Sequence, residues 1–370
     1  MSEIRPFRLH VPDDVLEDLR SRLRHARLLD DSPRRMPSGM SASWLRDLVR
    51  TWADWDWRAR EEWLAGFPQF LADVDGTDIH VAHLRSTRPD ASALLIMHGW
   101  PHTFALQLDV AAALPDLHVV VASLPGFAFS APYADGPMTE RRIAATMHRL
   151  MTDVLGYDRY ITYGEDVSAN VSDLLAGAYP QHVSGIVATH AHFGTPQERE
   201  GIDDPEVEAF FARLDADGGP HGAYGHVQWA RPDTLAAALN DSPAGLLAWI
   251  AEKLSEWADT SGDDPSAVEQ VISRDRILTE ATIYWVSQSI ATSFRPYHEG
   301  PDTPEAIPEV EVPAAVFVQR HEHDYPEVLA RRFYRDLRVF ERLEHGGHFT
   351  AAEIPEGMAE RIRDFAAALR

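Results

Sequence analysis

The sequence of 370 residues predicts an α/β fold, in which a mostly parallel β-sheet carries helices on both faces. Three observations support this prediction. From residue 70 onward, short apolar runs alternate with helical patterns, which is typical of strand–helix–strand units. The alternation stops between residues 195 and 307, where a helical cap insertion is expected, and then resumes. Residues 1–69 are expected to form an N-terminal helical extension.

The N-terminal segment, 1–69, is expected to pack on the rest of the chain. Within 15–27, apolar residues fall at helical spacing after Pro12 and Asp13. Five tryptophans lie between positions 44 and 63 and are predicted to form one apolar seam. Nothing in this segment indicates catalysis.

The first part of the core is expected at 70–194. Strand-like runs occur at 70–74, 78–84, 93–97, 119–122, 160–163 and 185–189. Asp75-Gly76-Thr77 is predicted to be the hairpin turn between the first two. Helices are predicted at 139–155 and 166–179, so that the later strands run parallel.

The cap is expected at 195–307, with helical patterns at 234–239, 244–257 and 280–291. The core should then resume at 308–370, with strands at 314–319 and 339–343 and a helix from Pro326. In the last helix, the apolar residues Met358, Ile362, Phe365 and Leu369 form one stripe for burial.

Composition limits the partners of the chain. The formal net charge of −24 argues against nucleic acid and anionic membranes as partners, because most of the protein surface would repel a polyanion. The absence of cysteine excludes disulfides, thiolate catalysis and cysteine-bound metals. The charged start of the chain lacks the apolar region of a secretory signal, and no window reaches the roughly 18 apolar residues of a membrane span. We therefore expect a cytoplasmic protein with no membrane partner.

The segment Gly164-Glu165-Asp166-Val167-Ser168 lies between a predicted strand and a predicted helix. A sharp strand-to-helix turn needs small residues two positions before and two positions after its apex. Gly164 and Ser168 meet this requirement when Asp166 is the apex. A carboxylate at a helix N-terminus stays ionised and can attack a carbon that bears a leaving group. Asp166 is therefore a candidate nucleophile, and an N-capping aspartate is the structural alternative.

Two further loops follow predicted strands. In His98-Gly99-Trp100-Pro101, the Trp100 N–H is a candidate oxyanion donor, together with the Val167 N–H that follows the nucleophile. In Gly346-Gly347-His348-Phe349, the histidine lies between the last strand and the last helix. The order nucleophile, acid, histidine places a catalytic base there. A plain turn and a surface histidine are the alternatives.

With these features in this order, the chain resembles a microsomal-type epoxide hydrolase of the α/β-hydrolase fold, in a soluble bacterial-type version. The resemblance covers nearly the whole chain and implies that 1–69 is an epoxide-hydrolase N-terminal segment. Besides the three loops above, it rests on Ile4-Arg5-Pro6-Phe7, Trp55-Asp56-Trp57-Arg58, Leu124-Pro125-Gly126-Phe127, Leu239-Asn240-Asp241-Ser242-Pro243-Ala244-Gly245-Leu246 and Ser293-Phe294-Arg295-Pro296-Tyr297.

The resemblance implies two cap tyrosines that hydrogen-bond the epoxide oxygen as the ring opens. Tyr297 matches one of them, and Tyr224 matches the other. A phenol is a suitable donor to the alkoxide that ring opening produces. A packing aromatic is the alternative role for each residue.

The sequence departs from the family pattern at three places. Val167 stands where relatives commonly have tryptophan, and His298 stands beside Tyr297. The third departure concerns the acid that orients the histidine, because the usual separation from His348 leads to His321.

Two acids close to His321 are candidates for that role. Glu322 is the preferred one, after a slip of one residue in the loop, and Asp324 is the second choice. The run His321-Glu322-His323-Asp324 also fits a metal cluster, since histidines at i and i+2 of an extended segment point the same way. A solvated loop is the remaining interpretation.

The expected reaction is the addition of water to a small neutral epoxide, giving a vicinal diol through an ester on Asp166 that a His348-activated water hydrolyses. No metal and no cofactor are expected, and the chain is expected to form a homodimer. Substrate contacts are assigned to His98, Gly99, Pro101, Phe193, Trp229 and Trp285. A haloalkane dehalogenase-like hydrolase with the same nucleophile and a non-catalytic binding protein are the alternatives.

Overall fold

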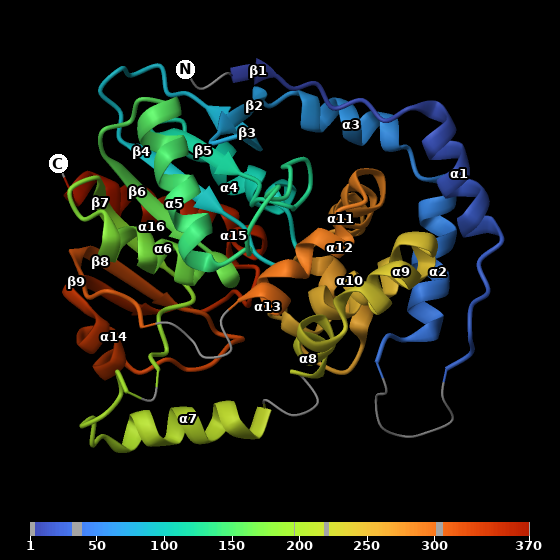
Figure 1. Ribbon diagram of the computed structural model, residues 1–370. Helices are drawn as coiled ribbons and strands as arrows, with labels where there is room; N and C mark the ends of the chain where they lie inside the picture. The colour runs from blue at the N-terminus through green and yellow to red at the C-terminus, as the bar shows by residue number, and fades with distance from the viewer. Residues whose placement is uncertain (1–3, 32–38, 196, 218–221, 301–305, 370) are drawn as a thin grey trace.

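The computed structural model describes residues 4–31, 39–195, 197–217, 222–300 and 306–369 (Figure 1). In this part of the chain, one sheet of nine strands has the order β1-β2-β3-β5-β4-β6-β7-β8-β9. The strands β1 to β3 and β5 pair antiparallel, and the order from β5 to β9 is parallel. The predicted fold class is therefore confirmed. The strands are β1 (Ile4–Pro6), β2 (Gln69–Val74), β3 (Thr77–Leu84), β4 (Ala93–Met97), β5 (His118–Ala122), β6 (Tyr160–Gly164), β7 (Val183–Ala188), β8 (Val310–Val318) and β9 (Tyr334–Arg342).

Strand β1 was not expected, since residues 1–69 were predicted to be helical. Ile4, Arg5 and Pro6 pair with Ala72, Leu71 and Phe70 at the edge of the sheet. All three β1 residues are exposed, so they show no alternation of apolar and polar side chains. A strand of this kind forms because a partner edge is available, which local sequence does not reveal.

The two faces of the sheet bury two separate clusters. Along β4, Leu94 and Ile96 point into one cluster, and Leu95 and Met97 point into the other, as the period of two requires. Helices α5 (Glu140–Arg149) and α6 (Val167–Ala178) pack on the second of these faces. Helices α4 (Leu108–Ala112) and α16 (Pro355–Ala368) cover the first. In the predicted stripe, Met358, Ile362 and Phe365 are buried, and Leu369, just past the end of α16, is partly buried.

Three other helical stretches complete or border the core. Helix α14 (Glu327–Phe333) precedes β9, and α15 (Thr350–Glu353) precedes α16. The single helix predicted at 139–155 is divided, because α5 ends at Arg149 and a π-helical turn, Leu150–Val154, follows.

The cap helices lie between β7 and β8 in the chain and gather on one side of the sheet, with α7 apart from the rest (Figure 1). The helix predicted at 280–291 begins earlier, and its successor is separate because Gln288, at φ 53°, ends α11 in the left-handed conformation. The cap helices are α7 (Pro205–Asp217), α8 (Ala223–Ala230), α9 (Pro232–Asp241), α10 (Pro243–Trp257), α11 (Arg274–Ser287), α12 (Ile290–Ser293) and α13 (Arg295–Glu299).

The N-terminal helices α1 (Asp13–Arg24), α2 (Ala42–Asp54) and α3 (Trp57–Ala65) contact the cap through tryptophans. The indole N–H groups of Trp44, Trp52 and Trp55 donate to Glu269, Thr282 and Asp275 at 2.9, 2.9 and 2.8 Å. The expected single seam is wrong, because Trp44 and Trp52 belong to one buried cluster and Trp57 to the other. Among the described residues, no helix is both long and apolar enough to cross a bilayer.

Candidate active site

Asp166 lies at the apex of the turn between β6 and α6, at φ 55°. The turn is so tight that a Cβ atom on Gly164 would lie 2.0 Å from the carbonyl oxygen of Ser168. A Cβ atom on Gly99 would lie 2.4 Å from Cβ of Asp166. Both glycines are therefore required by close approach, and the strained backbone presents the Asp166 side chain at the end of the parallel strands.

Backbone amides hold one side of the Asp166 carboxylate. The Trp100 N–H donates to Oδ1 at 2.9 Å, and the Val167 N–H also binds the carboxylate. Burial opposes ionisation, but the hydrogen bonds from His348 and these amides outweigh it and lower the pKa of Asp166. The carboxylate is therefore ionised at neutral pH, and Oδ2 is the oxygen that the amide of Trp100 leaves free.

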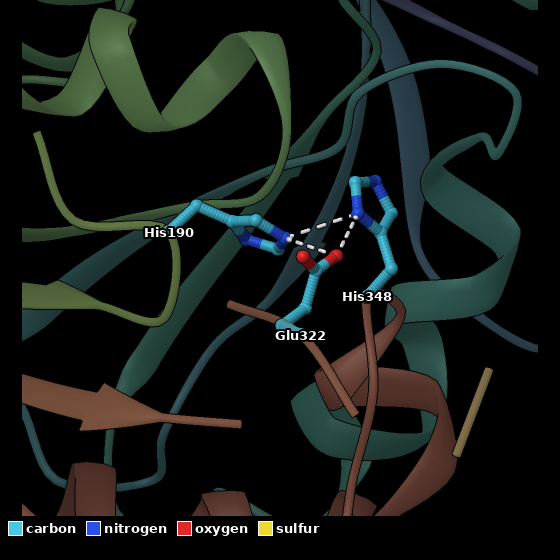
Figure 2. A group of neighbouring side chains, drawn as sticks. All are labelled: His190, Glu322 and His348. Carbon is cyan, nitrogen blue, oxygen red and sulfur yellow. Dashed lines mark hydrogen bonds and ion pairs between the residues drawn. The ribbon is translucent and has the colours of Figure 1, made fainter. Parts of the chain in front are cut away.

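His348 links Asp166 to Glu322. Its Nε2 lies 3.5 Å from Oδ2 of Asp166, and its Nδ1 lies 2.6 Å from Oε1 of Glu322 (Figure 2). Burial alone would lower the pKa of His348, but its contacts with the Asp166 and Glu322 carboxylates raise it to about 10. The same contacts lower the pKa of Glu322 well below its usual value despite burial. The free site therefore holds a charged imidazolium between two carboxylates.

Of the two predicted acids, the structure brings only Glu322 to the histidine. Asp324 instead pairs with Arg342 at 2.7 Å. The ring of His321 turns away and meets the carbonyl of Glu256 at 3.4 Å. The ring nitrogens of His321 and His323 do not come together with a third possible ligand, so the run 321–324 forms no metal cluster. Among the described residues, the one group of suitable metal ligands is His190, Glu322 and His348, which belongs to the site itself.

The two predicted tyrosines lie together beside Trp100. The ring of Tyr224, on α8, stacks on the Trp100 indole with centroids 5.2 Å apart and planes at 12°. The ring centroid of Tyr297, on α13, lies 6.1 Å from that of Tyr224 and 6.4 Å from that of Trp100. Burial raises the pKa of both phenols, and the charge of Asp166 adds to the increase. Both groups therefore keep their protons and can act as donors.

Comparison with known proteins identifies the family of the chain, in agreement with the resemblance found from the sequence. The family described as "Epoxide hydrolase N terminus" matches residues 4–106, and "alpha/beta hydrolase fold" matches residues 92–273. A "Putative epoxide hydrolase" from Stigmatella aurantiaca is 32% identical, over 98% of this chain and 84% of its own length. "Epoxide hydrolase 1" from Sus scrofa is 30% identical, over 98% and 88%. The chain belongs to the epoxide hydrolase family.

Solved structures of other epoxide hydrolases superpose on this family member. The juvenile hormone epoxide hydrolase of Bombyx mori has a TM-score of 0.87 at 26% identity, covering 100% of this chain and 95% of that one. The epoxide hydrolase of Aspergillus niger has a TM-score of 0.86 at 27% identity, covering 100% and 97%.

The loop after β4 carries His98, Gly99 and Pro101, and each of these residues has its own contacts. The ring of His98 is fully buried, and its Nε2 accepts the Leu124 N–H at 3.1 Å. Burial lowers the pKa of His98 to about 3, so the ring is neutral and joins two loops. Gly99 contacts Asp166, and Pro101 follows a cis peptide bond.

Of the other three predicted substrate contacts, Phe193 follows β7, and Trp229 and Trp285 lie on cap helices. Phe193 is 39% exposed and packs against Phe210. Trp229 is 48% exposed. Trp285, on α11, has the guanidinium of Arg22 over its ring at 5.7 Å, on the side that faces the N-terminal helices. The role of these three side chains as substrate contacts stays a prediction.

Sequence reasoning missed His190, which follows β7 and joins the group in Figure 2. Its Nε2 lies 3.2 Å from Nδ1 of His348 and 3.8 Å from Oε1 of Glu322. A polar residue directly after a parallel strand was the available signal, since strand ends converge at such a site.

The second missed residue is Glu165, a fully buried carboxylate next to the nucleophile. Its Oε1 accepts the Tyr163 hydroxyl at 2.6 Å and the Ala351 N–H at 2.8 Å. Burial opposes its charge, but hydrogen bonds, above all from His102, lower the pKa of Glu165 to about 2. Glu165 thus ties the turn of Asp166 to the helix that follows His348.

Proposed function

We propose that this chain hydrolyses a small neutral epoxide to a vicinal diol through a covalent ester on Asp166. The observation that carries the proposal is the position of the Asp166 carboxylate. Its Oδ1 is bound by the Trp100 amide, and its Oδ2 faces His348. The indole of Trp100 contacts both tyrosines, and the charge of Asp166 acts on both phenols.

In the first step, Oδ2 of Asp166 attacks an epoxide carbon, and the carbon–oxygen bond of the ring breaks. Tyr224 and Tyr297 hydrogen-bond the leaving oxygen, and one of them gives it a proton. The imidazolium of His348 supplies the compensating proton. Since ester formation removes the negative charge of Asp166, one cause of the raised pKa of His348 disappears and the ring becomes a base.

In the second step, neutral His348 takes a proton from water, and the hydroxide attacks the carbonyl carbon of the ester. Glu322 stabilises the imidazolium that forms. The tetrahedral intermediate develops its charge on Oδ1, to which the Trp100 amide already donates, and the Val167 amide also binds this carboxyl group. The bond between the carbonyl carbon and the alkyl oxygen then breaks, and the proton of the added hydroxyl passes to that oxygen, which releases the diol and restores the carboxylate.

A haloalkane dehalogenase would use the same nucleophile. The indole N–H of Trp100 is buried without a hydrogen-bond partner among the described residues and would suit a halide. The paired tyrosines favour the epoxide, because a leaving halide needs no proton. Measuring halide release beside diol formation separates the two activities.

The test of the proposal is intact mass of His348→Gln after incubation with a panel of aryl and alkyl epoxides. Without its base, the protein should accumulate an adduct of one epoxide mass on Asp166, while wild type forms diol. The matched control is Asp166→Asn/His348→Gln, which should gain no mass. Diol formation by wild type without an adduct on the variant would contradict the covalent route. A cytoplasmic location and a homodimeric state stay predictions, to be tested by cell fractionation and light scattering.

A further inference from the structure

The carboxylate of Glu353, the last residue of α15, lies against the loop that carries His348. Its Oε2 accepts the Gly347 N–H at 3.0 Å, and its Oε1 accepts the Phe349 N–H at 3.0 Å. One side chain therefore binds the backbone on both sides of the histidine. Burial raises the pKa of Glu353 to about 7, although the backbone hydrogen bonds lower it. The two contacts restrain the loop because they flank the histidine.

The same carboxylate also binds the cap. Oε2 of Glu353 accepts the N–H of Asp259, two residues after α10, at 2.7 Å. The cap segment 257–259 returns two contacts to the loop. The Trp257 carbonyl accepts the His348 N–H at 2.9 Å, and Oδ2 of Asp259 accepts the Gly346 N–H at 3.0 Å. All four backbone N–H groups from Gly346 to Phe349 are thus bound by Glu353 or by the cap.

The close approach explains the glycine at position 347. A Cβ atom there would lie 2.6 Å from both the Asp259 nitrogen and the Trp257 carbonyl oxygen. The ring of Trp257 packs 4.9 Å from His348 and 5.0 Å from Tyr224. The cap segment bound by Glu353 therefore contacts both the catalytic base, His348, and a cap phenol, Tyr224.

We propose that Glu353 is a positioning residue that fixes the His348 loop against cap segment 257–259 and so sets the position of the base for ester hydrolysis. The inference rests on the proposed function. It assigns Glu353 to the second step, since there His348 must hold a water molecule against the ester carbonyl, whereas in the first step the tyrosines contact the reacting oxygen and His348 only returns a proton. A base that is misplaced by a fraction of an ångström loses much of its rate advantage.

The experiment follows both steps separately in single turnovers of Glu353→Gln with an epoxide that wild type converts. The glutamine amide points an NH₂ group at backbone donors and cannot accept all three bonds. We expect ester hydrolysis to slow by about tenfold or more, alkylation to stay within about twofold, and ester to accumulate on Asp166. Glu360→Gln, which removes an exposed carboxylate from α16, is the matched control and should behave as wild type. Equal losses in both steps, or no loss, would overturn the proposal.

A second variant and a second measurement cover other outcomes. Asp259→Ala removes the acceptor of the Gly346 N–H and an ion pair with the exposed Arg320, and it should give the same selective loss at a smaller size. It decides the matter if Glu353→Gln does not fold. In ligand-free protein, the proton between Nδ1 of His348 and Glu322 should give a downfield NMR signal that shifts in Glu353→Gln and not in Glu360→Gln. An unchanged signal in folded Glu353→Gln refutes positioning, whereas wild type that converts no epoxide refutes the proposed function alone.

Discussion

Oε1 of Glu322 lies 2.6 Å from Nδ1 of His348, although Glu322 follows the position that family spacing gives for the acid by one residue. The loop resolves this difference through its backbone. The His321 N–H donates to the Gly346 carbonyl at 3.1 Å, and His321 forms a β-bridge with Gly347. Neighbouring side chains of an extended segment point in opposite directions, so Glu322 faces His348 while His321 faces away.

The contact predicts that Glu322, and not Asp324, supports the base. Glu322→Gln should slow ester hydrolysis by about 10²-fold or more, because the imidazolium loses its charged partner. Asp324→Asn should stay within about twofold, since Asp324 pairs with Arg342 on the surface. Single-turnover rates of both variants check the assignment. A loss confined to Asp324→Asn would reverse it.

The two cap tyrosines predict an effect on the first step. Tyr224→Phe and Tyr297→Phe should each slow alkylation by about 10²-fold, because one donor to the developing alkoxide is lost. The rings would keep their packing on Trp100. Since that indole lies beside the site, stopped-flow tryptophan fluorescence should follow the step. Rates of ester hydrolysis should change little, and a variant that slows only hydrolysis would contradict the role of its phenol.

The charges of the site predict different pH profiles for the two steps. Alkylation needs an ionised Asp166, whose pKa is lowered, and protonated phenols, whose pKa values are raised. The rate of alkylation should therefore be flat between about pH 6 and 9. Hydrolysis needs neutral His348, whose pKa of about 10 in the free site falls when the ester neutralises Asp166. Its rate should therefore rise with pH and level off below pH 10. Glu322→Gln should move this rise to lower pH.

Local features of the sequence predicted the nucleophile turn, because a strand and a helix that approach closely need small residues between them. They also predicted the fold, because buried strands and helices need apolar residues at regular spacing. Gly164 and Asp166 could be read in this way. For His190, the sequence indicates only a position after a strand, because its contact with His348 exists only in the folded chain. Glu353 could not be read at all, since its role depends on a contact with Asp259 that only the folded chain creates. Trp285 shows the converse limit, because an aromatic on a cap helix reveals nothing about the side to which it points.

The last prediction concerns stability and a carboxyl group outside the chemistry. Asp173, on α6, is 1% exposed and accepts the Tyr334 hydroxyl at 2.9 Å. Its Oδ2 has no partner among the described residues. Burial, with the nearby charges of Glu140 and Glu198, raises the pKa of Asp173 from 3.8 to about 8 in spite of the Tyr334 bond.

Between these two pKa values the folded protein holds a proton that the unfolded chain releases, so the free energy of unfolding falls as pH rises from about 4 to 8. Asp173→Asn keeps the shape and an acceptor for Tyr334 but cannot ionise. We expect its Tm relative to wild type to increase by at least ~3 °C between pH 5 and pH 8. Thermal melts followed by circular dichroism across this range measure the difference, with Glu360→Gln as the control. A Tm difference that is constant with pH would show that Asp173 has the same protonation state in the folded and unfolded protein.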